Sequence, residues 1–479
     1  MTATGTTSAD GPGDGGWTAA WELLLPTASA PPRGRGRMLQ SALREAVRSG
    51  RIAAGTRLPS SRELSADLGV SRGLVTDAYE QLTAEGYLSS ARGAGTWVSG
   101  AARAVAAAGP TRHPAPEVRR AGFLPGSPDL SLFPRTAWSA AHRRVLAELP
   151  HDGLGYPDPC GLAALRAAVA ALLTRRRGVV AEPGRVIICS GVAQAMTLLC
   201  TVLRTRAPGP GVVAVEDPGS PEHHALIAAS GLATAAVPLD AEGMSPRALA
   251  AAGARAAVLT PAHQFPSGIA YSARRRTELL DWARAADGLL VEDDYDGDFR
   301  YDRAPVGALQ GLDPERVAYT GSVSKSLAPG LRLGWLVLPE ALVAPVAEVK
   351  RTMDLGHPVL DQALLADFIT RGDYDRQLRR CQRAYRERRD VLVAELTERY
   401  PGTEITGIAA GLHVIARLPA RFGPQRRFLA EAGRAGVALR PLDDYTGAPP
   451  PPGGAVRLVL GYAHLPPARI REAVRLLPR

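Results

Sequence analysis

Apolar residues recur at helical spacing in the stretch that ends near residue 99. Leu64 and Leu68 mark a short helix, and Gly69 and Val70 form a tight turn after it. A second helix follows Ser71, a good N-cap residue, and carries one apolar stripe, made of Leu74, Val75, Ala78, Tyr79 and Leu82. Residues 87–98 then predict two short strands around a turn at Gly93–Gly95. Helix, turn, helix and wing is the layout that places a second helix in the major groove of DNA.

A different pattern occupies the chain from Gly122 onward. Short apolar runs alternate with helices rich in Ala, Leu and Arg, which predicts an α/β domain with a mainly parallel sheet. The runs are VIICS, VVAVEDP, AAVLTP, LLVEDD, VAYTGS and LGWLVLP. From about Glu340 a long Arg-rich helix precedes the strands GLHVIARLP and AVRLVLGYA, which predict a smaller α+β lobe.

These patterns divide the chain into four segments. Residues 1–16 lack an apolar period and are expected to be a disordered tail. Residues 17–99 are the expected winged helix-turn-helix domain, and residues 100–121, rich in Ala, Pro and Arg, are the expected linker. Residues 122–479 are the expected α/β domain with its small lobe. The predicted fold class is therefore α/β, with a winged module at the N-terminus.

The composition narrows the classes of protein without selecting one. The 479 residues carry a formal charge of +10 and a pI near 9.8, which permits nucleic-acid binding but also suits an ordinary enzyme. Apolar stretches are short and interrupted, so we expect no transmembrane helix, no secretory signal and no contact with a membrane. The four scattered cysteines form no CxxC pair. They predict reduced thiols in the cytoplasm rather than a metal site or a disulfide framework.

The use of lysine directs attention to one residue. Of 57 lysines and arginines only two are lysines, Lys325 and Lys350, and a lysine can form an imine whereas an arginine cannot. Lys325 lies in TGSVSKSLAPGLRLGW, directly after a predicted strand that ends at Tyr319–Thr320. The neighbouring hydroxyls of Ser322 and Ser324 and the guanidinium of Arg332 are suited to phosphate oxygens. This combination predicts a site for an aldehyde cofactor that carries a phosphate.

Two further runs add groups that such a cofactor needs. VEDDYD places Asp293 and Tyr295 at the end of an apolar strand, where ligands bind in α/β folds. A carboxylate there can pair with a pyridinium nitrogen, and a phenol can hydrogen-bond a ring hydroxyl. CSGVAQAM predicts a strand, a Gly turn and a helix start, whose free N–H groups at Val192, Ala193 and Gln194 suit a phosphate.

The winged module presents polar side chains where DNA phosphates are expected. Arg62, Ser71, Arg72 and Thr76 lie at or near predicted helix starts, and Arg92 projects from the wing turn. LGVSRGLVTDAYEQLTAEGYL, followed by GAGTWV, closely resembles the GntR family of bacterial regulators. The resemblance implies DNA contacts by Arg62, Ser71, Arg72, Gly73 and Thr76, with Gly95 shaping the wing.

Most of residues 122–479 resembles the fold-type I pyridoxal-phosphate enzymes. The matching runs are GYPDPCGLAALRAAVAALL, SGVAQA, EDPGSP, PAHQFPSG, EDDYDGDFRY and SVSKSLAPGLRLGW. Together with the N-terminal module, the chain resembles the MocR-type subfamily of GntR regulators, including its pyridoxal-phosphate-sensing branch. The resemblance assigns Lys325 to the Schiff base, Asp293 to the pyridine nitrogen and Tyr295 to the ring oxygen. It assigns Ser322, Ser324 and Arg332 to the phosphate, and it implies a homodimer in which Tyr156 reaches the phosphate of the partner subunit.

Three positions depart from the enzyme pattern. Ser220 stands where an aromatic side chain commonly stacks on the cofactor ring, and Phe265 stands where the enzymes have Asn. Val459 occupies the slot of the arginine that binds a substrate carboxylate, with Arg457 or His224 as replacements to be tested. We therefore expect a transcriptional regulator rather than an enzyme, with pyridoxal phosphate itself as the signal and vitamin B6 metabolism as the controlled process.

Other readings stay open at this point. The chain can be a true aminotransferase with an accessory N-terminal domain, or the cofactor site can be inactive and serve only dimerisation. An amino acid can be the effector in place of the cofactor alone. The sequence gives neither the operator, nor the sign of regulation, nor whether any transamination occurs.

Overall fold

The computed structural model describes residues 31, 34–91, 95–101, 121–206, 211–302, 306–447 and 455–479. The predicted tail at 1–16, most of the predicted linker and the wing residue Arg92 lie outside these residues. The chain divides into two compact units, residues 1–117 and residues 118–479. Among the described helices, none is long and apolar enough to cross a membrane.

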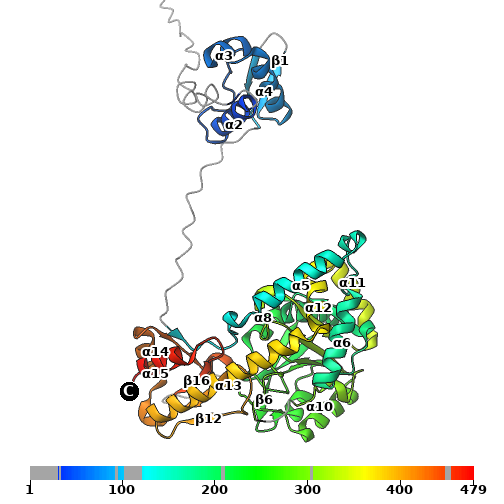
Figure 1. Ribbon diagram of the computed structural model, residues 1–479, viewed down its shortest axis with the longest axis vertical. Helices are drawn as coiled ribbons and strands as arrows, with labels where there is room; N and C mark the ends of the chain where they lie inside the picture. The colour runs from blue at the N-terminus through cyan, green and yellow to red at the C-terminus, as the bar shows by residue number, and fades with distance from the viewer. Residues whose placement is uncertain are drawn as a thin grey trace, which may run out of the picture. The chain divides into compact units, whose positions relative to one another are not determined.

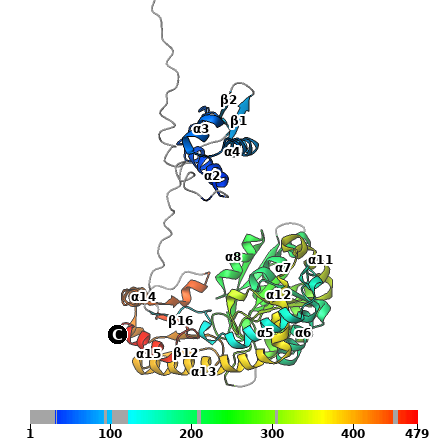
Figure 2. The ribbon, with the colours of Figure 1, turned by 45° about the horizontal axis from the view of Figure 1, so that its top comes forward.

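The N-terminal unit has the predicted winged layout. Its elements are α2 (Arg35–Arg48), α3 (Ser61–Leu68), α4 (Arg72–Ala84), β1 (Leu88–Ala91) and β2 (Gly95–Val98). The two strands pair antiparallel as a hairpin (Figure 2). Ser60 caps α3 in a capping box with Glu63, and the Ser71 hydroxyl accepts from the N–H of Leu74 at 3.3 Å. The predicted stripe on α4 is buried, apart from the partly buried Leu74, in one core with α2 and α3.

The second unit is built on an eight-stranded sheet in the order β4-β11-β10-β9-β8-β5-β6-β7. Its strands are β4 (Val186–Cys189), β5 (Val212–Asp217), β6 (Ala233–Asp240), β7 (Gly243–Met244), β8 (Ala256–Leu259), β9 (Leu289–Asp293), β10 (Val317–Ser322) and β11 (Gly334–Val337). Neighbouring strands are parallel except where β11 or β7 takes part. The predicted parallel sheet is thus confirmed, although β10 runs two residues beyond its predicted end, to Ser322.

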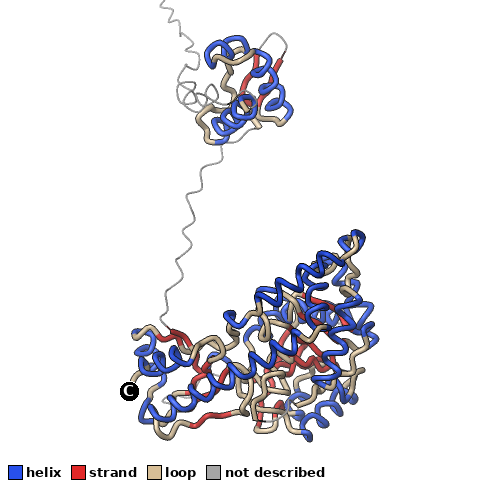
Figure 3. Tube along the Cα trace, viewed as in Figure 1, coloured by secondary structure: helices blue, strands red, loops and turns tan. Residues whose placement is uncertain are grey.

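Helices enclose this sheet on both faces, as Figure 3 shows. Side chains on opposite faces of one strand pack in different clusters: Ile187 with α7 and α11, Ile188 with α5, α6 and α12. The helices are α5 (Arg135–Glu148), α6 (Ala163–Arg177), α7 (Val192–Arg206), α8 (Pro221–Ala229), α9 (Pro246–Ala251), α10 (Ala273–Ala285), α11 (Glu340–Asp354) and α12 (Val359–Thr370).

The predicted Arg-rich helix is α13 (Asp373–Arg399), which leads from the large lobe into a small lobe (Figure 1). The small lobe has a four-stranded sheet, β12-β13-β16-β15, and a short parallel pair in which β3 joins β14. Its elements are β3 (Ala121–Gly122), β12 (Glu404–Thr406), β13 (His413–Arg417), α14 (Gln425–Arg434), β14 (Val437–Ala438), β15 (Arg440–Pro441), η7 (Leu442–Tyr445), β16 (Arg457–Gly461) and α15 (Pro467–Leu476).

Candidate functional site

The predicted cofactor-binding side chains converge on one edge of the large sheet. Parallel strands end at the same edge, so the segments after β4, β5, β8, β9 and β10 meet there. Because β11 runs the opposite way, the residues before it reach the same edge, and they include Arg332. Asp293 lies close enough to Lys325 and Tyr295 for its charge to act on both groups.

Three consecutive acidic residues at the end of β9 point to different surroundings. Successive side chains of a strand alternate between its faces, so Glu292 and Asp294 are turned away from Asp293. Glu292 accepts from the N–H groups of Leu309 and Gln310 at 2.9 and 3.0 Å, and burial raises its pKa to about 7. Asp294 pairs with Arg177 at 2.6 Å, with both side chains almost fully buried. Only Asp293 of the three is left to face the site.

Asp293 is held by a histidine that the sequence did not single out. His223, in the first turn of α8, lies with its Nε2 2.9 Å from Asp293 Oδ2, and both side chains are buried. Burial alone would lower the pKa of His223, but the hydrogen bond and negative charge of Asp293 outweigh it and raise the pKa. Asp293 Oδ1 is buried without a hydrogen-bond partner. An unpaired buried carboxylate oxygen is costly, so this atom is suited to a donor brought by a ligand.

Lys325 lies in the loop after β10, and its Nζ donates to the carbonyl oxygen of Gly126 at 2.6 Å. Burial lowers the pKa of the Lys325 amine, and the charges of Asp296, Asp293 and Glu222 oppose that shift without reversing it. A larger fraction of the amine is therefore neutral and nucleophilic than in an exposed lysine.

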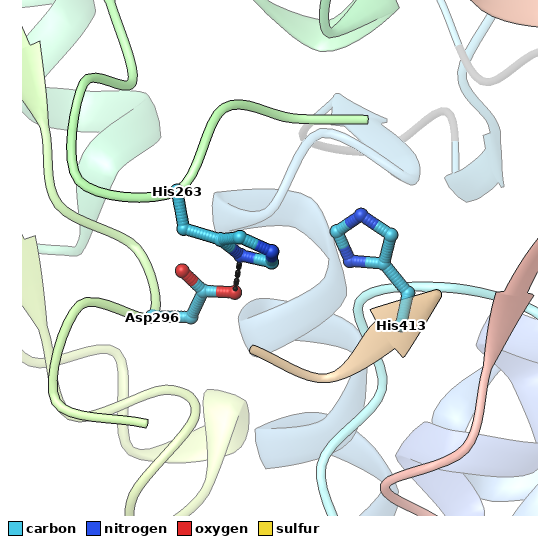
Figure 4. Close-up of side chains that lie close together, drawn as sticks. All are labelled: His263, Asp296 and His413. Atoms are coloured by element: carbon cyan, nitrogen blue, oxygen red, sulfur yellow. Dashed lines mark hydrogen bonds and ion pairs between the residues drawn. The ribbon is translucent and has the colours of Figure 1, made fainter. Parts of the chain in front are cut away.

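Tyr295 belongs to a hydrogen-bonded cluster with His263 and Asp296. Figure 4 shows the contact of His263 with Asp296, beside His413. His263 Nδ1 lies 2.9 Å from Asp296 Oδ2 and 3.1 Å from the hydroxyl of Tyr295. Burial raises the pKa of Tyr295, so its phenol stays protonated and can donate. His413 stands beside His263 and donates through Nε2 to the Pro266 carbonyl at 3.0 Å, while burial lowers its pKa to about 3. Both His263 and Asp296 lie in quoted motifs, but only the fold shows their contact with Tyr295.

The predicted phosphate ligands form a second end of the site. The guanidinium of Arg332 donates to the Ser190 carbonyl, directly before α7. Gly191 has φ +81°, and a Cβ there would lie 3.2 Å from the Arg332 guanidinium, so the glycine leaves this approach open. Val192, Ala193 and Gln194 form the first turn of α7, where N–H groups have no intrahelical acceptor. The structure therefore brings a cation to a helix N-terminus.

The remaining predicted phosphate ligands have local roles in the structure. The hydroxyl of Ser322 accepts from the N–H of Ser324 at 3.3 Å, which shapes the turn before Lys325. The Gln194 side chain accepts from the Ser190 N–H at 2.7 Å and donates to Asp354 at 2.6 Å. Asp354 also pairs with the second lysine, Lys350, whose side chain is fully buried.

Tyr156 does not face the site of its own chain. Its side chain is 91% exposed, beside the exposed Leu154. The segment that contains Tyr156 packs against the end of α11, because a Cβ at Gly356 would lie only 2.8 Å from Pro157. Met353 and Leu355, which directly precede Gly356, are also exposed. We call Leu154, Tyr156, Met353 and Leu355 the apolar patch.

The candidate carboxylate ligands are engaged elsewhere. Val459 is fully buried in β16. Arg457 pairs with Asp443 at 2.6 Å. His224 Nδ1 lies 3.2 Å from the Thr234 hydroxyl, and burial lowers the pKa of His224. None of these three offers a free cation to a bound amino acid.

In the winged unit the predicted DNA contacts gather at two helix starts. Arg62, Ser71, Arg72 and Gly73 are exposed, whereas Thr76 is partly buried and donates to the Arg72 carbonyl at 3.0 Å. The Nε of Arg72 lies 3.4 Å from the Ser61 hydroxyl, which brings the start of α4 next to the start of α3. Gly95 has φ +108° in the wing.

Comparison with known proteins gives a class to each unit. Residues 126–477 match the model of the aminotransferase class I and II family, and residues 36–98 match bacterial regulatory proteins of the gntR family. α-Aminoadipate aminotransferase LysN from Thermus thermophilus, solved with N-(5'-phosphopyridoxyl)-L-leucine, is 28% identical. The match covers 74% of this chain and 90% of that one with a TM-score of 0.64.

Two relatives share both units with this chain. The HTH-type pyridoxine biosynthesis transcriptional regulator PdxR of Corynebacterium glutamicum is 35% identical over 88% of this chain and 92% of its own. The probable rhizopine catabolism regulatory protein MocR of Rhizobium meliloti is 34% identical over 92% of each. An aminotransferase-like unit joined to a DNA-binding winged helix defines a class of transcriptional regulators. This chain belongs to the MocR-type subfamily of the GntR family.

The lowered pKa of Lys325 predicts a pH-dependent stability difference. Below the pKa of an unfolded lysine, about 10.4, the unfolded chain holds this proton more tightly, so the amine lowers the free energy of unfolding. That cost disappears as the pH rises through about 10.4. We expect Lys325→Met to raise the free energy of unfolding at neutral pH, with a gain that vanishes above that value. Urea denaturation across this pH range measures it, and a pH-independent gain would contradict the lowered pKa.

Lys350→Met is the contrasting variant. It removes the cationic partner of Asp354 from a buried position, so it is expected to lower the free energy of unfolding at neutral pH.

Proposed function

We propose that this regulator binds pyridoxal 5'-phosphate and that the cofactor itself is its signal. The observation that carries the proposal is the buried Oδ1 of Asp293, which has no hydrogen-bond partner among the described residues. The charge of Asp293 also acts on both the Lys325 amine and the Tyr295 phenol. A protonated pyridine nitrogen would satisfy that oxygen and would place the ring between these groups.

The proposed roles follow the chemistry of each side chain. When bound, the cofactor would supply an aldehyde group, and Lys325 would be the residue whose amine holds it. Asp293, held by His223, keeps the pyridine nitrogen protonated, and Tyr295 donates to the ring oxygen. The phosphate is bound at the second end of the site. Its ligands are the side chains of Arg332, Ser322 and Ser324 and the N–H groups of Val192, Ala193 and Gln194.

The proposal that the cofactor alone is the signal depends on the missing carboxylate site. An ionised carboxylate leaving water needs a fixed donor, and Arg457 is already paired with Asp443. By contrast, the cofactor phosphate has the Arg332 guanidinium beside a helix N-terminus. The relative named as a regulator of pyridoxine biosynthesis supports vitamin B6 metabolism as the controlled process. The proposed location of the regulator is the cytoplasm.

We also infer a homodimer. Leu154, Tyr156, Met353 and Leu355 are each exposed in two segments that meet at Pro157 and Gly356, and exposed apolar side chains that lie near one another mark protein interfaces. Met353 lies 3.7 Å from the Gln194 amide at the start of α7. A partner docked on this patch would therefore lie near the phosphate end, where Tyr156 of one subunit can reach the site of the other.

Covalent attachment is tested with Lys325→Ala. The wild-type protein with pyridoxal phosphate should show an absorbance band near the visible edge that borohydride removes while labelling Lys325. The variant should keep its fold, because the surrounding sheet does not depend on the amine, and should lose the band. An unchanged band in Lys325→Ala would refute the assignment.

The nature of the signal is tested by operator binding. We expect pyridoxal phosphate alone to change operator affinity about 5- to 150-fold, the usual range for coupled sites. Fluorescence anisotropy with and without the cofactor measures the change, followed by a panel of amino acids. A strong response to one amino acid, with none to the cofactor alone, would overturn the proposal and make Arg457 the candidate carboxylate ligand.

DNA binding is tested at the start of α4. Arg72→Ala removes an exposed guanidinium and should weaken specific operator binding by about tenfold or more. Arg44→Ala removes the same charge at the other end of α4, where Arg44 pairs with Glu85, and is the matched control. Equal losses in both variants at one salt concentration would indicate a general charge effect and contradict the assigned contact.

A further inference from the structure

One element of the small lobe lies directly against the loop that precedes α8 in the large lobe. The N–H of Gly219 donates to the carbonyl of Tyr445 at 2.9 Å. The N–H of Gly447, two residues after Tyr445, donates at 3.1 Å to Oδ1 of Asp217, two residues before Gly219. These bonds join η7 and the residues directly after it to the segment at 217–220. Gly219 of that segment lies four residues before His223.

The ring of Tyr445 extends a row of aromatic side chains that ends at the site. It packs edge-on against Phe265, with ring centroids 5.2 Å apart and planes at 86°. Phe265 in turn packs edge-on against Tyr295, at 5.9 Å and 85°. Tyr445 is therefore separated from the proposed ring-oxygen ligand by one aromatic side chain. Burial raises the pKa of Tyr445 to about 12, so it remains a neutral phenol.

The large lobe has a serine rather than an aromatic residue at the start of α8. Ser220 occupies the N-cap position of α8, and its hydroxyl donates to Glu222 at 2.9 Å rather than accepting a bond from the helix start. A serine is too short to cover a planar ring, and its hydrogen-bonding group is already directed toward Glu222. Gly219, its neighbour, is the residue that contacts Tyr445.

Charged contacts fix Tyr445 to its own lobe. Arg457 of β16 pairs with Asp443 Oδ1 at 2.6 Å, and Gln425 of α14 donates to Asp443 Oδ2 at 2.6 Å. Arg440 of β15 pairs with Asp444 at 3.2 Å. The η7 turn is thus tied to the sheet and a helix of the small lobe, so Tyr445 moves with that lobe. This also gives Arg457 a structural role in place of carboxylate binding.

We propose that Tyr445 is a binding residue for the aromatic cofactor, supplied by the small lobe, and that the bound cofactor thereby holds the small lobe against the 217–220 loop. The inference rests on the proposed cofactor site. A ligand that contacts both lobes favours the arrangement in which they meet, and that arrangement favours the ligand equally. Binding of the cofactor would therefore change the contact between the two lobes, and a sensor needs such a change in structure to report that its ligand is bound.

The test uses the full chain and three variants. Tyr445→Ala should raise the dissociation constant for pyridoxal phosphate about two- to tenfold, the range for one aromatic contact, when measured by titration of the absorbance band. Tyr445→Phe keeps the ring and should bind like the wild type. Leu442→Ala, which shortens another side chain of the same turn, is the matched control. Unchanged affinity in Tyr445→Ala, or an equal loss in Leu442→Ala, would overturn the proposed contact.

A double variant separates ring binding from lobe contact. Ser220→Tyr combined with Tyr445→Ala returns an aromatic group from the large lobe and should restore affinity. Hydrogen exchange at the amides of Gly219 and Gly447 reports the lobe contact. The cofactor should slow this exchange in the wild type but not in the double variant, and slowing in both would overturn the coupling. If the wild type shows no absorbance band, the proposed cofactor site fails and the role of Tyr445 fails with it. A wild-type band with unchanged affinity in Tyr445→Ala overturns the role of Tyr445 alone.

Discussion

The direction of three neighbouring carboxylates at the end of β9 sets the arrangement of the whole site. Glu292 fastens the strand to the segment at Leu309 and Gln310, and Asp294 fastens it to Arg177 on α6. Together these two contacts fix the rotation of the strand about its axis. With that rotation fixed, Asp293 can face only the site, where it takes its partner from α8 and keeps one oxygen free.

Much of this arrangement could be predicted because it is encoded locally. The winged unit follows from an apolar stripe at helical spacing and from Ser71 as a cap, and both were found in the structure. The strand ends that carry Asp293 and Lys325 follow from apolar runs that stop at polar residues. The prediction of a mainly parallel sheet places the ends of most of the six predicted strands on one edge, and only β11 runs the other way.

Contacts between distant segments could not be predicted in the same way. Asp296 meets His263 across 33 residues, and Asp293 meets His223 across 70. Nothing in the spacing of those residues indicates that they touch, because the sheet order decides it. Arg457 shows the same limit. The position of Arg457 on its strand suggested a ligand for a substrate carboxylate. In the structure its guanidinium forms an ion pair with Asp443 of the η7 turn instead.

The scarcity of lysine has a consequence for chemical selectivity. An aldehyde reacts with accessible amines, so a protein that handles one risks random adducts on its surface. Here the chain has only two lysine amines. One is fully buried and held by Asp354, which makes it inaccessible. The other is Lys325, whose environment favours its neutral form. The 55 other cations are guanidiniums, which supply positive charge for DNA without competing for the aldehyde.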